Sequence, residues 1–121
     1  MKRLSPKEEQ VMELLWEHGP LYVREMLAFY EEPRPHFNTV STVVRMLEDQ
    51  GFILHKAFGR NHQYFAAISR DEFKNKTLKG VISKYFNNSY LGAVSTLVKN
   101  EEISLDELKA LIQQVENRQN Q

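Results

Sequence analysis

The spacing of apolar residues changes at Gly51. Up to that glycine, apolar side chains recur every three or four residues, as on one face of a helix. Beyond it come two β-prone runs, residues 52–58 and 62–68, joined by a short turn at 59–61. This change predicts helices followed by a hairpin, and hence a mainly α-helical protein with a small β element.

Three helices are predicted ahead of the hairpin. The first covers residues 6–18, because Ser5 can cap it and a proline follows at the first helical position. The second begins near Tyr22 and runs for about three turns before two prolines end it. The third covers residues 38–50, with Asn38 as its cap. Three helices and a hairpin are the order of a winged helix-turn-helix, in which the third helix reads DNA and the hairpin is the wing.

The outward side of the third predicted helix is small and polar, where a solvated helix would carry lysine and glutamate. Its inward side is a valine stripe completed by Leu47. Short polar side chains let a helix approach base edges, where Asn can pair with adenine and Arg with guanine or a phosphate. The predicted DNA-binding residues, including two at the hairpin tip, are Asn38, Thr39, Ser41, Thr42, Arg45, Arg60 and Asn61.

Composition restricts the other functions open to the chain. Sixteen basic and sixteen acidic residues cancel, so nucleic-acid binding must depend on a local patch, and residues 33–64 carry an excess of only two positive charges. The absence of cysteine excludes disulfides, thiolate zinc sites and cuprous clusters. The histidines at 18, 36, 55 and 62 lack metal-ligand spacing and are interpreted as surface or packing residues. No cofactor, metal or catalytic residue is predicted.

Residues 69–121 contain three further helical segments. Helices with such large apolar residues cannot bury their faces within about fifty residues, so a second chain is expected to cover them. The chain is therefore predicted to divide into a winged-helix DNA-binding domain, 1–68, and a helical dimerisation domain, 69–121. The predicted dimerisation residues are Phe73, Val81, Tyr85, Phe86, Leu91, Val94, Leu97, Leu108, Leu111 and Ile112.

No apolar run approaches the roughly 18 residues that cross a bilayer, and no signal-peptide core follows the first residues. We therefore expect a cytoplasmic protein with no membrane partner.

Several motifs in one order resemble the penicillinase repressor family of the BlaI/MecI type, to which the copper-responsive CopY repressors are related. They are "LLWEHGP", "VREML", "GR" before the tyrosine strand, and the terminal "SLDEL". The resemblance covers nearly the whole chain. It implies a dimeric bacterial repressor that binds an inverted-repeat operator, with residues 38–50 in the major groove and residues 59–61 as the wing.

The chain departs from both branches of that family. Repressors of the β-lactam branch are inactivated by cleavage of an Asn-Phe bond, and the corresponding pair here is Thr96 and Leu97. The cysteine motif of the copper branch has no counterpart. The resemblance therefore leaves any sensor or protease partner unidentified.

Two other functions remain open from the sequence. Winged helices also serve as protein–protein interaction modules without DNA binding, since a fold does not by itself determine a function. An enzyme is the third alternative, and it would require catalytic groups assembled from distant positions. The outer side of the third helix discriminates between DNA binding and the interaction module, because only DNA binding depends on it.

Overall fold

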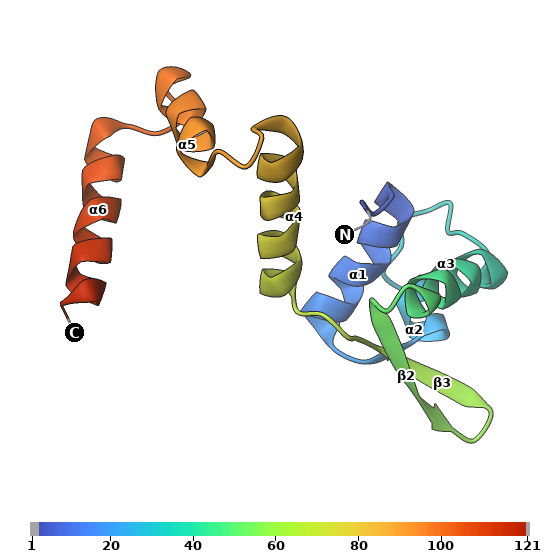
Figure 1. Cartoon of the computed structure of the whole chain (residues 1–121). Coiled ribbons are helices and arrows are strands. Elements are labelled where there is room, and N and C mark those ends of the chain that lie inside the picture. The colour runs from blue at the N-terminus through green and yellow to red at the C-terminus, as the bar shows by residue number, and fades with distance from the viewer. Residues whose placement is uncertain (1–2, 121) are drawn as a thin grey trace. The chain divides into compact units, whose positions relative to one another are not determined.

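The computed structural model describes residues 3–120, which form two compact units that divide between Thr77 and Leu78 (Figure 1). The first unit contains three helices, a three-stranded antiparallel sheet of order β1-β3-β2, and the start of a fourth helix. Its elements are α1 (Pro6–His18), β1 (Leu21–Tyr22), α2 (Val23–Leu27), α3 (Phe37–Asp49), β2 (Ile53–Phe58), β3 (Asn61–Ala66) and α4 (Arg70–Tyr85). This is a winged helix followed by helical segments, as predicted.

The helix α1 begins where its sequence predicts. The Ser5 hydroxyl accepts a hydrogen bond from the Glu8 backbone N–H, and the Glu8 carboxylate accepts one from the Ser5 N–H at 2.9 Å. These reciprocal bonds satisfy two amides that an uncapped helix would leave without partners. At the other end Gly19, with φ +78°, stops the helix.

The helix α2 is shorter than the three turns expected from the sequence. After Leu27 the chain tightens into turns in which each N–H bonds to the carbonyl three residues earlier, as Ala28 does with Glu25. Its N-terminal neighbour Tyr22 is not helical, because with Leu21 it forms a short strand paired to β3. The sequence interpretation missed this strand, since two residues are too few to show alternation.

The helix α3 starts one residue before the predicted position. The cap residue is His36, whose extended backbone carbonyl accepts hydrogen bonds from the N–H groups of Thr39 and Val40. The prediction that Asn38 caps this helix is therefore wrong, because Asn38 lies within the first turn and its side chain is exposed. The predicted end is confirmed, since Gly51 takes the left-handed φ of +87°.

One apolar core holds the first unit together. Side chains from all three helices and the sheet meet in it, and several are completely enclosed, among them Met12, Met26, Leu47 and Ile53. Each such side chain contributes about 1.5–3 kcal/mol when removed from water. Because α3 places its Val40, Val44 and Leu47 stripe in this core, its opposite side must face outward.

The start of α4 belongs to the first unit. The indole Nε1 of Trp16 donates a hydrogen bond to the carbonyl of Ile68 at 2.9 Å, and the Trp16 ring lies 5.4 Å from that of Phe73. The Arg70 Nη2 donates to the Glu13 Oε2 at 2.7 Å. Phe73, expected to face a partner chain, thus packs against the core of its own first unit.

The second unit consists of the rest of α4 with α5 (Tyr90–Lys99) and α6 (Leu105–Gln119). Ser89 caps α5, and Ser104 with Glu107 forms a capping box at α6. No side chain of α5 or α6 is buried within the described chain, and Leu91 is 84% exposed. Over residues 3–120, no helix is both long and apolar enough to span a bilayer.

Candidate nucleic-acid interface

The outer side of α3 carries the predicted reading residues. Asn38, Thr39, Thr42 and Arg45 are exposed, and Ser41 is partly exposed. Two of these side chains bond back to their own helix: the Thr42 hydroxyl donates to the Asn38 carbonyl at 2.8 Å, and the Arg45 Nε donates to the Ser41 carbonyl at 3.4 Å. A guanidinium has five donors, so this bond leaves most of the recognition capacity of Arg45 available.

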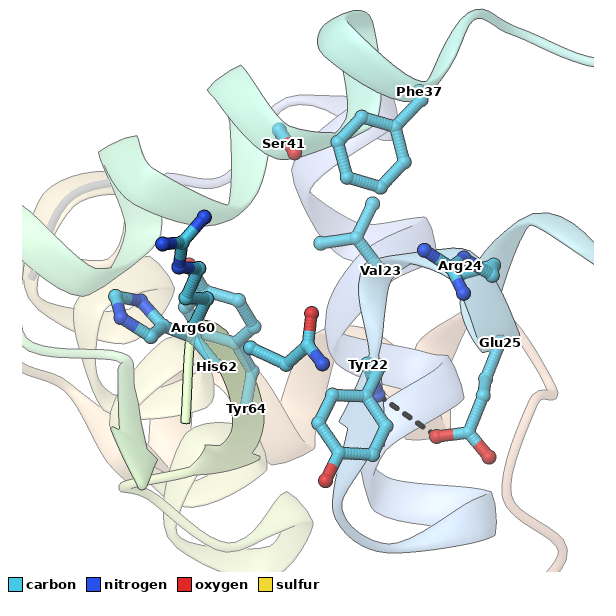
Figure 2. Close-up of a pocket in the computed structure, with 10 residues that line it drawn as sticks. Tyr22, Val23, Arg24, Glu25, Phe37, Ser41, Arg60, His62 and Tyr64 are labelled. Carbon is cyan, nitrogen blue, oxygen red and sulfur yellow. Dashed lines mark hydrogen bonds between the residues drawn. The ribbon is translucent and has the colours of Figure 1, made fainter. Parts of the chain in front are cut away.

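A groove of about 550 Å³ lies between α2, α3 and the hairpin formed by β2 and β3 (Figure 2). Of the predicted residues, Ser41, Arg60 and Asn61 line it, while the others lie on α3 outside its lining. The Arg60 guanidinium extends toward Ser41, and the Phe37 ring lies next to Val23 (Figure 2). The complete lining is Tyr22, Val23, Arg24, Glu25, Phe37, Ser41, Arg60, Asn61, His62 and Tyr64.

Positive charge predominates slightly in this groove. Arg24 and Arg60 stand against one carboxylate, Glu25, which accepts a hydrogen bond from the Tyr22 backbone N–H at 2.9 Å. Two guanidinium groups at one groove suit the phosphates of a nucleic-acid backbone, because guanidinium binds phosphate with paired donors. Of the basic residues counted along 33–64, only Arg60 lines this groove, and Arg24 of α2 supplies the second positive charge.

Tyr64, one of the residues that line the groove, is buried and stays protonated. Burial raises the pKa of the Tyr64 phenol, the nearby Glu48 carboxylate raises it further, and the Arg45 guanidinium lowers it by less. Since this pKa lies above an ordinary value of 10.0, the phenol is a neutral hydrogen-bonding group at physiological pH.

Several groove residues were missed by the sequence interpretation. Phe37 and Tyr22 were not selected, because an isolated aromatic residue has no pattern to distinguish it. His62, which lines the groove, and its neighbour His55, which lies outside the lining, were treated only as surface or packing residues. The strand alternation contained a signal, since Tyr64 lies opposite His55 and Ala57 lies opposite His62, which puts both histidines on one sheet face.

A helix with a small polar outer side, a hairpin beside it, and a helical extension define a winged-helix protein. The family model described as the penicillinase repressor matches residues 4–117. The chain belongs to the penicillinase repressor family, and the resemblance found in its motifs is confirmed.

Three relatives illustrate the similarity. The methicillin resistance regulatory protein MecI of Mammaliicoccus sciuri is 26% identical over 109 residues, 89% of each chain. MecI of Staphylococcus aureus (strain Mu50 / ATCC 700699) is 30% identical over 73 residues, 60% of this chain and 59% of the relative. The penicillinase repressor of Bacillus licheniformis is 21% identical over 119 residues, 98% of this chain and 93% of the relative. These relatives identify a transcriptional regulator rather than an enzyme.

Proposed function

We propose that this protein is a repressor that binds an inverted-repeat operator in double-stranded DNA as a homodimer. In this proposal α3 enters the major groove, and the turn between β2 and β3 contacts the backbone or minor groove beside it. The single observation that carries the proposal is the exposed outer side of α3, which presents short polar side chains and Arg45 to solvent.

The arrangement of the first unit supports this docking. The core holds α3 by its valine stripe, so the helix can meet a duplex as a rigid element. The groove between α3 and the wing places Arg60 on the same side as Ser41, which allows one duplex to be contacted by both elements (Figure 2). Contacts from the wing and from α3 together would fix the position of the protein along the duplex, which neither contact would do alone.

The second unit supports the homodimer. Its exposed apolar side chains include Leu91, Leu97 and Leu111, and a second copy would remove them from water. Two-fold symmetry would pair two reader helices with two half-sites, about one helical turn apart or a multiple of it. Two modest basic grooves would then act on one operator, which answers the objection that the net charge is zero.

A binding-site selection on the purified full chain, followed by titration of the selected duplex, tests the proposal. Arg45→Ala, and Thr42→Ala in a second variant, should weaken binding about tenfold to a hundredfold, because each removes a contact to a base or phosphate. Arg118→Ala, which removes an equal charge from an exposed position on α6, should change affinity less than about twofold.

The circular dichroism spectrum and the sedimentation of each variant should match those of the parent protein. A chain that enriches no duplex, or an Arg45→Ala variant that binds like the parent, would refute DNA reading by α3. The protein-interaction module would then be favoured.

A further inference from the structure

A chain of three side chains connects α3 to the wing. Glu48, in the last turn of α3, has its Oε2 2.5 Å from the Nδ1 of His55 in β2. The His55 ring stacks on that of His62 in β3, with centroids 4.1 Å apart and an angle of 9° between the planes. A carboxylate only accepts hydrogen bonds, so His55 donates from Nδ1 and its ring orientation is set by Glu48.

The ring of Tyr64, in β3, contacts the rings of both histidines. Its ring lies tilted at 5.7 Å from His55 and edge-on at 6.2 Å from His62. The side chains of His55 and Glu48 are only 32% and 25% exposed. These partly enclosed contacts are therefore shielded from water enough to have a defined geometry, unlike a typical surface ion pair.

The connection lies where the hairpin leaves the body of the protein. In β2, Ile53 is fully buried, whereas every residue from Lys56 to the Arg60 turn is exposed. A projecting two-stranded hairpin has little independent rigidity. The contact between Glu48, His55 and His62 thus restrains the part of the wing that carries Arg60 relative to α3.

We propose that His55 is a positioning residue for DNA binding. Bonded to Glu48 and stacked on His62, it holds the wing at the angle at which Arg60 reaches the duplex that α3 reads. The proposal rests on the function proposed above. In it, His55 affects how strongly and how specifically the wing binds DNA, although His55 itself need not touch the DNA. His62 transmits the constraint, because it lines the same groove as Arg60 (Figure 2).

A double-mutant cycle on the full chain tests the positioning role, because a residue that acts through the wing must be coupled to the residue at the wing tip. The four proteins are the parent, His55→Ala, Arg60→Ala and the double variant, titrated with the selected operator. Each single change should weaken binding about fivefold to tenfold, and the double variant should bind within about twofold of Arg60→Ala alone. Losses that multiply would overturn the proposal, as would an unchanged affinity for either single variant.

Two further variants separate positioning from general destabilisation. Glu48→Gln keeps an oxygen that accepts from His55 and should bind the operator within about twofold of the parent, whereas Glu48→Ala should lose as much affinity as His55→Ala. Equal losses for both Glu48 variants would contradict the role of the hydrogen bond. His55→Phe keeps a stacking ring without the bond, and it replaces His55→Ala in the cycle if the alanine variant fails to fold.

The outcome for the parent protein distinguishes the two proposals. If the parent protein binds no duplex, the proposed repressor function is refuted. If the parent binds tightly but the affinity losses of the His55 and Arg60 variants are independent, only the positioning role is refuted.

Discussion

The two units of this chain contrast in how they treat apolar surface. The first closes its own core, in which Met12, Met26 and Leu47 are completely buried. In the second, Ile82 is the one apolar side chain buried among residues 78–120, although α5 and α6 are well capped and regularly amphipathic. Local signals are thus sufficient to form helices, but only the first unit has the neighbours that bury them. This difference supports a partner chain for the second unit.

The largest expected effect is on the free energy of unfolding, when a leucine in each unit is replaced by alanine. Leu47→Ala should lower the free energy of unfolding by about 2–5 kcal/mol at any protein concentration, because it opens a cavity in a closed core. Leu97→Ala should destabilise by an amount that depends on protein concentration, since its burial would require association. Chemical denaturation at two concentrations a hundredfold apart measures both. A concentration-independent effect at Leu97 would break the comparison.

A charge on the exposed apolar side should separate the subunits. Leu97→Asp should shift the protein to monomers in sedimentation equilibrium and lower operator affinity about a hundredfold, because the avidity of two linked half-site contacts is lost. The matched control is Ser95→Asp, an equally charged change at an exposed polar position of α5. If the control dissociates the protein as strongly, the apolar side of α5 is not the dimer contact.

The smallest effect concerns two glycines in different settings. Gly80 lies inside α4, and a Cβ added there would meet nothing within 4 Å, so Gly80→Ala should stabilise the protein by about 0.5–1 kcal/mol. Gly51 has a left-handed φ of +87°, so Gly51→Ala should destabilise it by about 1–2 kcal/mol. Thermal unfolding of both variants gives the signs. Destabilisation by Gly80→Ala would mean that assembly brings another surface against this glycine.

Sequence and structure agree where the determining interaction is local. Ser5 and Glu8 specify the start of α1, and Gly51 specifies the end of α3. They differ where a distant strand decides the outcome, as at Leu21 and Tyr22, which pair with residues more than forty positions away. Asn38 resembles a cap in sequence, but the cap of α3 is His36, two residues earlier.

The candidate site follows the same division. The outward position of Thr42 and Arg45 could be predicted, because it is the complement of a valine stripe on one helix. The groove could not, since its residues come from β1, α2, α3, the hairpin turn and β3. The contact between Glu48 and His55 depends on how the hairpin packs against α3, which no helical or strand period encodes.

The two hydrogen bonds that Thr42 and Arg45 make to carbonyls of α3 affect how strictly an operator would be discriminated. A polar side chain that loses its base partner is usually left without a hydrogen bond. This increases the loss of binding free energy at each mismatched base pair. Here both side chains have an intrahelical acceptor to return to. For a repressor reading DNA through them, single mismatches at the contacted positions should fall near the low end of the usual range of about 1–3 kcal/mol. Such a protein would serve a set of degenerate promoters rather than one unique sequence.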